Sequence, residues 1–132
     1  MPDRFYHQEP PSQAEQGSEE AIQARWLRDA ATMCPDVLLA AVPNGGKRTG
    51  YARAKVKREG IKKGFPDIIA TWPGGVAFIE FKKRGEYPDA DQRKILNRLA
   101  LQGHAVAVVR SSKGAFDFLK LQGAPFAGEW HL

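Results

Sequence analysis

The chain has 132 residues, of which 42% are hydrophobic and 27% charged, a composition typical of one globular domain that excludes a collagen-like repeat and a wholly disordered chain. The longest nearly apolar stretch, residues 105–109, is far too short to span a bilayer, and the first residues lack a signal-peptide core, so we expect a soluble cytoplasmic protein. The net charge is +5, and one cysteine with three scattered histidines excludes an internal disulfide and the usual zinc spacings.

The N-terminal part of the sequence divides into an arm and a helix. Residues 1–17 are rich in Pro, Gln and Glu and have no apolar periodicity, which predicts a flexible arm. Ser18 is a candidate N-cap, and apolar residues recur at helical spacing from Ile22 until Pro35, so we expect the first helix between the cap and the proline.

Four apolar runs predict strands, over residues 37–42, 67–72, 76–82 and 105–109. The last run is apolar on both faces, and a helical pattern that begins at Asp89 or Asp91 and ends at Gly103 precedes it. Such a crossover favours a central strand parallel to the third one. A last short helix is expected around residues 116–119. The order predicts an α/β domain over residues 18–122, with a mixed sheet flanked by helices, and an unassigned tail over residues 123–132.

Basic residues are concentrated between Lys47 and Lys63. This segment holds eight basic residues and one acid, so its charge of +7 leaves −2 for the other 115 residues, and residues 51–59 are weakly helical. Lys and Arg gain affinity for polyphosphates by displacing condensed counterions, which predicts a DNA-binding surface; a solvated cationic helix face is the alternative. The residues expected to contact DNA are Lys47, Arg48, Arg53, Lys57, Arg58, Lys62 and Lys63.

The second and third strands are expected to form a hairpin that brings charged side chains together. Period two puts Glu80 and Lys82 on one face of the third strand. If the Gly74–Gly75 pair forms a two-residue turn, Asp67 lies opposite Lys82 and on the same face, whereas a three-residue loop would put it on the other face. Glycines favour the two-residue turn because such turns need positive φ.

Two neighbouring carboxylates repel each other unless a cation holds them, and oxygen ligands of this kind suit Mg²⁺ or Mn²⁺. The hairpin therefore predicts a metal site, beside which Lys82 could activate a water or neutralise charge on a phosphate. A surface ion pair at a strand end is the alternative explanation of the Glu80–Lys82 spacing.

The sequence also carries several short motifs in a telling order: Glu19 with Gln23, Pro43-Asn44-Gly45-Gly46, Lys57-Arg58-Glu59-Gly60, Gly64-Phe65-Pro66-Asp67, Phe78-Ile79-Glu80-Phe81-Lys82, Gln92 and Val108-Val109-Arg110. Their order and spacing resemble the VRR-NUC (virus-type replication-repair nuclease) family of the PD-(D/E)xK nucleases, over roughly residues 18–112. The resemblance implies an αβββαβ nuclease core and a metal-dependent phosphodiesterase that hydrolyses DNA to leave 5′-phosphate ends.

The resemblance also implies roles for single residues. Asp67 and Glu80 would be metal ligands, with the backbone carbonyl of Phe81 completing the protein shell and Mg²⁺ or Mn²⁺ as cofactor. Lys82 would position or activate the water. Asn44 lies in a turn near the active site of this family and could hydrogen-bond DNA or a catalytic carboxylate.

Two further catalytic candidates lie on helices. Gln92 shares a helical face with apolar residues, so it points at the sheet and could meet Lys82 or a phosphate; it could equally complete the first turn of its helix. On the first helix, Glu19 lies near the middle of the apolar face and Glu20 at its edge, so we choose Glu19 as the catalytic carboxylate. Both acids would also suit the positive N-terminus of that helix.

These features predict a Mg²⁺-dependent DNA endonuclease, selective for Holliday-junction-like or other branched DNA, in viral or prophage replication or repair within a bacterial or phage-infected cell. One alternative is an accessory nickase or flap nuclease in a larger complex. Another is a DNA-binding module without activity, although such a module would be expected to have lost at least one of Asp67, Glu80 and Lys82.

We also expect a homodimer. One active site cuts one strand, so paired incisions in a four-way junction need two copies, and a twofold dimer is the simplest arrangement. Four aromatic residues outside the expected core could form the interface or pack on their own subunit: Phe5, Tyr6, Phe126 and Trp130.

Overall fold

The computed structural model describes residues 6–43 and 58–128. Its strands form one mixed sheet in the order β1-β5-β4-β3-β2, in which β2, β3 and β4 are antiparallel neighbours and β5 runs parallel to both β4 and β1. The strands are β1 (His7–Gln8), β2 (Leu38–Ala41), β3 (Ile68–Trp72), β4 (Gly75–Phe81) and β5 (Ala105–Val109). The predicted α/β class with a mixed sheet is confirmed.

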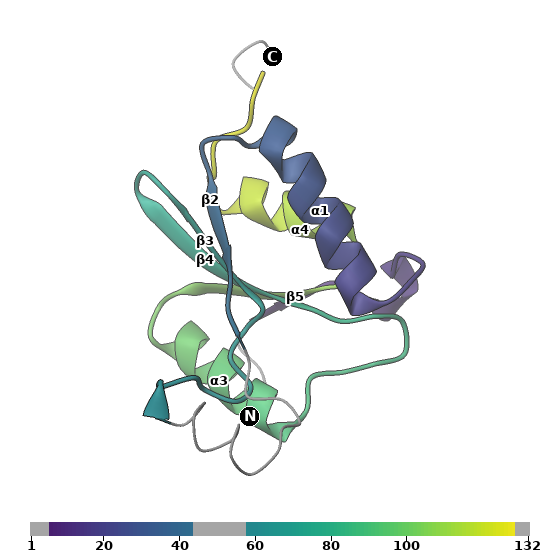
Figure 1. Cartoon of the computed structure of the whole chain (residues 1–132), viewed down its shortest axis with the longest axis vertical. Helices are drawn as coiled ribbons and strands as arrows, with labels where there is room; N and C mark the ends of the chain where they lie inside the picture. Colours follow the sequence, from purple (N-terminus) through teal and green to yellow (C-terminus); the bar gives the residue numbers. More distant parts are fainter. Residues whose placement is uncertain (1–5, 44–57, 129–132) are drawn as a thin grey trace.

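Helices cover both faces of the sheet, as Figure 1 shows: α1 and α4 lie on one face and α3 on the other. The helices are α1 (Glu19–Met33), α3 (Ala90–Leu101) and α4 (Ser112–Leu121), with a short 3₁₀ turn, η1 (Pro11–Gln13), before α1. From α1 to β5 the order is the predicted αβββαβ; α4 is the expected last helix, longer than predicted, and β1 is an addition. None of the helices in the described ranges is long and apolar enough to cross a membrane.

Local signals define where the helices begin. The Ser18 side chain accepts a hydrogen bond from the Ala21 N–H (3.1 Å), and the helix that it caps ends at Met33, two residues before Pro35. Asp89 caps α3 in the same way, as one of the two residues expected there. These side chains satisfy N–H groups that the first helical turn leaves without a backbone partner.

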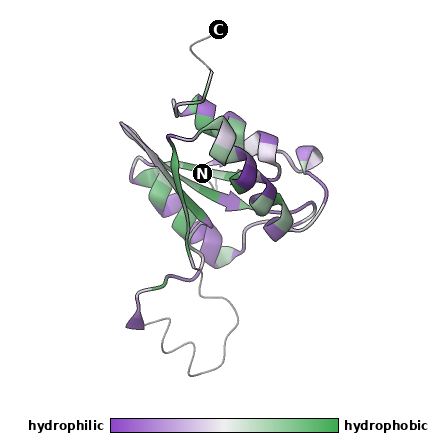
Figure 2. Ribbon diagram, turned by 45° about the horizontal axis from the view of Figure 1, so that its top comes forward, coloured by the Kyte–Doolittle hydropathy of each residue, from purple (hydrophilic) through white to green (hydrophobic). Residues whose placement is uncertain are grey.

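The alternation along β4 builds a separate core on each face of the sheet. Ile79 and Phe81 pack with Trp26 under α1 and α4, whereas Phe78 packs with Leu96 of α3. Figure 2 shows the hydrophobic strands enclosed between helices whose outer surfaces are hydrophilic. The central strands β4 and β5 are therefore buried on both faces, whereas the edge strand β2 is largely exposed.

The β3–β4 hairpin has a register two residues away from the predicted one. Trp72 pairs with Gly75, so the turn consists of Pro73 and Gly74 and not of the two glycines. Proline fixes the φ angle that the first turn position requires, and Gly74 supplies the positive φ (+87°) of the second. A shift of two residues leaves every side chain on its predicted face.

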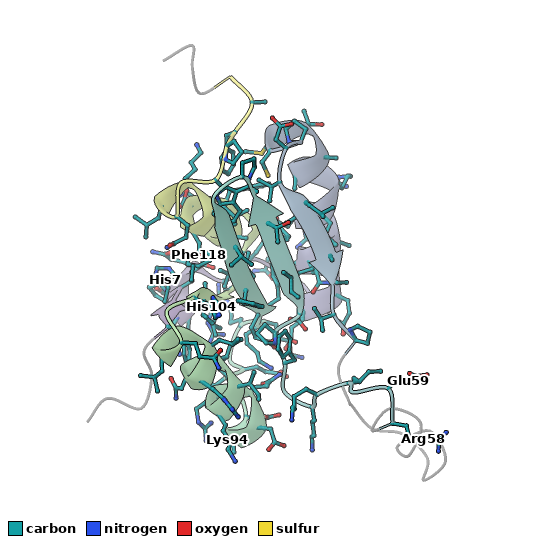
Figure 3. The ribbon with its side chains drawn as sticks, turned by 90° about the vertical axis from the view of Figure 1, so that its left-hand side faces the viewer. His7, Arg58, Glu59, Lys94, His104 and Phe118 are labelled. Atoms are coloured by element: carbon teal, nitrogen blue, oxygen red, sulfur yellow. The ribbon has the colours of Figure 1, made fainter. Side chains whose placement is uncertain are left out.

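The prediction of a flexible arm over residues 1–17 is wrong for the part that the structure describes. β1 pairs with β5, the His7 ring stacks on Phe118 with centroids 5.7 Å apart (Figure 3), and Tyr6 is buried on the α3 side. The buried Glu9 carboxylate accepts hydrogen bonds from the Arg110 N–H and, at 2.6 Å, from the Ser111 hydroxyl. A two-residue strand is too short to show periodicity, so the polar composition of the segment was the only signal and it predicted a flexible arm.

The C-terminal tail also folds back onto the domain. The Ala127 N–H donates to the Met33 carbonyl (2.9 Å), and the buried Phe126 ring contacts Phe116. Tyr6 and Phe126 thus pack on their own subunit, which is the alternative that the sequence left open for the aromatic residues. The other two, Phe5 and Trp130, lie outside the described residues.

Candidate active site

Two carboxylates meet at the end of the β3–β4 hairpin opposite its turn. Asp67 directly precedes β3, and its Oδ2 accepts a hydrogen bond from the Phe81 N–H at 2.9 Å. The observed register, continued by one residue, puts Asp67 opposite Glu80, whereas the sequence placed it opposite Lys82. Because the faces are preserved, the structure brings Asp67, Glu80 and Lys82 together.

Burial dominates the electrostatics of this group. Glu80 is only 2% exposed, and burial, together with the nearby charge of Asp67, raises its pKa to about 9. Burial also raises the pKa of Asp67, although the hydrogen bond from Phe81 and the charge of Lys82 act in the opposite direction. The buried Lys82 Nζ lies 3.7 Å from Glu80 Oε2 and does not fully offset the two carboxylates.

Gln92 completes the first turn of its helix, which is one of the two roles that the sequence left open, and it also contacts Glu80, whereas the sequence expected Lys82 or a phosphate. Its Oε1 accepts a hydrogen bond from the Asp89 N–H (2.9 Å), while its backbone N–H donates to the Asp89 carboxylate, so it completes a capping box at the start of α3. Its Nε2 donates to Glu80 Oε2 at 3.1 Å. One side chain therefore ties the active-site carboxylate to the first turn of the helix.

Glu19 faces the same cluster from α1. Burial raises its pKa, and so do a hydrogen bond with Glu86 and the charge of Asp67, whereas Lys82 lowers it. Glu20 is exposed but is close enough to raise the pKa of Asp67. The structure thus places Glu19 as expected, at the more central of the two positions.

Glu86 is a residue near the site that no sequence pattern predicted. This exposed residue lies in the loop between β4 and α3, pairs with Lys83 at 3.3 Å and shares a hydrogen bond with Glu19, which lowers its own pKa. An acidic residue in a loop belongs to no periodic pattern or motif from which its role could be predicted. Glu86 comes near the site only because the loop runs toward α1.

One oxygen of the carboxylate pair is available to bind a cation. Glu80 Oε1 is buried and has no hydrogen-bond partner in the described part of the molecule. An oxygen of this kind, beside a second carboxylate, fits the oxygen ligands that Mg²⁺ and Mn²⁺ prefer. Among residues 6–43 and 58–128, no group of three or more His, Cys, Asp or Glu side chains could hold a metal, so these two carboxylates would need backbone or water oxygens to complete a shell.

An open groove of about 460 Å³ leads to Asp67 along α1. One wall is formed by the first turns of the helix, where Glu19 and Gln23 lie one turn apart, and the other by the end of β2 and Pro43. Asn44 follows directly but lies outside the described residues, as do Lys47, Arg48, Arg53 and Lys57. The expected helix over residues 51–59 also lies outside the described residues, except for residues 58 and 59.

Comparison with known proteins identifies the family. The sequence model of the VRR-NUC domain matches residues 13–113. The chain belongs to the VRR-NUC family. A solved structure described as a VRR_NUC domain protein is similar to it, with a TM-score of 0.64 and 20% identity over 81% of this chain and 88% of that one, which supports the fold. No curated protein matches the chain.

Membership confirms the resemblance drawn from the motifs and gives this VRR-NUC domain a nuclease-type function with DNA as substrate. The match begins at residue 13, inside the segment that the sequence separated as an arm. Of the predicted DNA contacts, the described residues include Arg58, Lys62 and Lys63, all of which are exposed.

Proposed function

We propose that the protein is a metal-dependent DNA endonuclease whose active site is the cluster around Glu80. The observation that supports this most strongly is a fully buried carboxylate with an unpartnered oxygen, adjacent to Asp67 and to the Lys82 ammonium. Most buried polar atoms in native structures are hydrogen-bonded, so an unpartnered carboxylate oxygen calls for an explanation, which a bound cation supplies. The intact set of Asp67, Glu80 and Lys82 also disfavours a DNA-binding module without activity.

Each residue has a role in this proposal. Asp67 and Glu80 would hold Mg²⁺ or Mn²⁺ together with the Phe81 carbonyl, and a metal bound there would supply Lewis-acid chemistry and lower the pKa of a water. Lys82 positions that water or neutralises charge on the scissile phosphate. Gln92 fixes the orientation of the Glu80 carboxylate through its hydrogen bond.

Glu19 completes the proposed machinery from the other side of the cluster. It lies within electrostatic reach of Lys82, Asp67 and Glu80, so it adds a third carboxylate around the Lys82 ammonium. The predicted basic surface would then supply affinity through phosphate contacts with little dependence on base sequence.

For the substrate, we propose branched DNA in viral or prophage replication or repair, cut by a homodimer. The support is the need for two active sites to make paired incisions. Burial of Tyr6 and Phe126 within their own subunit removes two candidate interface residues, and this favours, as the second candidate, a nickase or flap nuclease that cuts one strand.

Cleavage of linear, flap and four-way DNA with Mg²⁺, Mn²⁺, Ca²⁺ or EDTA tests the proposal. Asp67→Asn, Glu80→Gln and Lys82→Ala should each abolish cleavage while DNA binding is retained, because they remove ligands or the activating charge and not the fold. Ca²⁺ should support binding more than turnover, since its coordination is looser. Asp36→Asn, in an exposed turn, is the matched control.

Full activity in excess EDTA, or in any of the three variants, would contradict the proposed mechanism. Comparison of the DNA structures distinguishes the two candidate functions. Paired symmetric cuts in four-way DNA by a dimer support the nuclease for branched DNA. Single nicks by a monomer, without preference for junctions, support the second.

A further inference from the structure

Helix α3 has a second polar face beside the one that carries Gln92. Lys94 and Arg98 follow Asp91 at spacings of three and four residues, so the three charged residues lie on one side of the helix, next to Ile95. Together with Lys62 and Lys63 they line a groove of about 320 Å³. This groove shares no lining residue with the one along α1.

A close contact holds the two walls of the α3 groove together. Gly64 has a φ of +86°, and a Cβ at this position would lie 2.8 Å from the Asp91 backbone. Only glycine permits this approach without strain. The contact places the Lys62–Lys63 pair against the start of α3, so cations from two separate segments face one concave surface.

The charge of this surface is largely uncompensated. The groove is lined by four basic residues and one acid, and that acid, Asp91, already pairs with Lys63 at 3.4 Å. Within the described ranges, the side chains of Lys62, Lys94 and Arg98 have no hydrogen-bond or ion-pair partner. Lys94 points away from the sheet (Figure 3). Three free cations around a hollow are the arrangement expected of an anion-binding site.

We propose that the α3 groove binds the phosphate backbone of the DNA on one side of the cleaved bond, with Lys94 and Arg98 as contacts beyond the predicted basic segment. This inference rests on the proposed nuclease function. Its geometric basis is that α3 also carries Gln92, which touches Glu80. Arg98 lies six residues further on, roughly 9 Å along the axis, which corresponds to about two or three nucleotides at about 3.4 Å per step.

Binding of a fluorescent DNA duplex, measured by anisotropy in Ca²⁺ over a series of salt concentrations, tests the groove. The test variant is Lys94→Ala with Arg98→Ala. The control is Lys113→Ala with Lys120→Ala, which removes two exposed cations from α4 on the opposite face of the sheet. Circular dichroism verifies that both variants fold.

Each phosphate contact contributes a slope of about −0.9 to the dependence of log affinity on log salt. Loss of two contacts should therefore make the slope shallower by about 1.8 and weaken binding by up to about 60-fold at 0.1 M salt. The control should keep the wild-type slope and Kd. An equal loss in both variants would mean that only net charge matters, and would overturn the proposal.

The outcome separates this inference from the proposed function. If the wild type binds and cuts DNA but the Lys94/Arg98 variant keeps the wild-type Kd and salt slope, the proposed DNA contact in the α3 groove is refuted and the proposed nuclease function is retained. If the wild type binds DNA through the groove but never cuts with Mg²⁺ or Mn²⁺, the groove stands and the nuclease is refuted. A wild type that does not bind DNA refutes both.

Discussion

Replacement of the titratable Glu80 carboxyl by an amide should make the stability of the metal-free protein less dependent on pH. The pKa of Glu80 is raised to about 9 from a usual value of 4.5. Between these two values the native protein retains a proton that the unfolded chain has released, so stability is highest below the lower value and falls as pH rises toward the higher one. The expected loss is about 1.4 kcal/mol per pH unit, or about 3 kcal/mol between pH 6 and pH 8.

Urea unfolding at pH 6, 7 and 8 in EDTA measures this effect. The quantity to follow is the difference in unfolding free energy between the wild type and Glu80→Gln, because the shared contributions of Asp67 and Glu19 largely cancel in it. This difference should change by about 3 kcal/mol in favour of the variant as pH rises from 6 to 8. Asp36→Asn, in an exposed turn, should show no such trend.

Mg²⁺ should stabilise the wild type more at pH 8 than at pH 6, because a bound cation replaces the proton between the carboxylates. The glutamine variant should lose most of this response. A wild-type-minus-variant difference that is independent of pH would refute the reasoning, since it would mean that the Glu80 carboxylate is ionised in the native metal-free protein as readily as in the unfolded chain.

Two further predictions concern residues that hold the fold around the site. Glu9→Ala should lower stability by about 2–4 kcal/mol and Tm by roughly 10 °C, because it leaves the buried N–H of Arg110 without its acceptor and the Ser111 hydroxyl without one partner. Thermal unfolding measures this effect, with Ser12→Ala as the control at an exposed site. A Tm equal to that of the control would contradict the prediction. Gly64→Ala should also destabilise the protein, by about 1–3 kcal/mol, because of the positive φ and the approach to Asp91; an unchanged urea midpoint would show that the contact carries no strain.

The sequence predicted those parts of the fold that local chemistry determines. Ser18 and Asp89 cap helices because their side chains reach N–H groups only two or three residues away, and the alternation in β4 follows from the pleat itself. The hairpin register was harder, because both the Pro73–Gly74 and the Gly74–Gly75 pair make a plausible two-residue turn. The side chains of the hairpin nevertheless lie on their predicted faces, because the predicted and observed registers differ by an even number of residues.

Parts of the structure that depend on distant partners could not be read from the sequence. Tyr6 and Glu9 look like residues of a polar arm until β5 and the start of α4 supply a strand to pair with and two donors for a buried carboxylate. Glu86 is similar, since its neighbour Glu19 lies 67 residues earlier in the chain. Strand alternation and the hairpin turn predicted the Asp67–Glu80–Lys82 cluster because all three residues lie within one hairpin and its flanks.

The double use of Gln92 links the dynamics of α3 to the geometry of the active site. The first turn of a helix opens more often than its middle, and each opening of this turn breaks the hydrogen bonds between Gln92 and Asp89. The same event removes the hydrogen bond that orients the Glu80 carboxylate from the α3 side. The lifetime of a correctly oriented Glu80 is therefore limited by helix fraying, and a ligand that holds the start of α3 closed also lengthens the time for which the site is assembled.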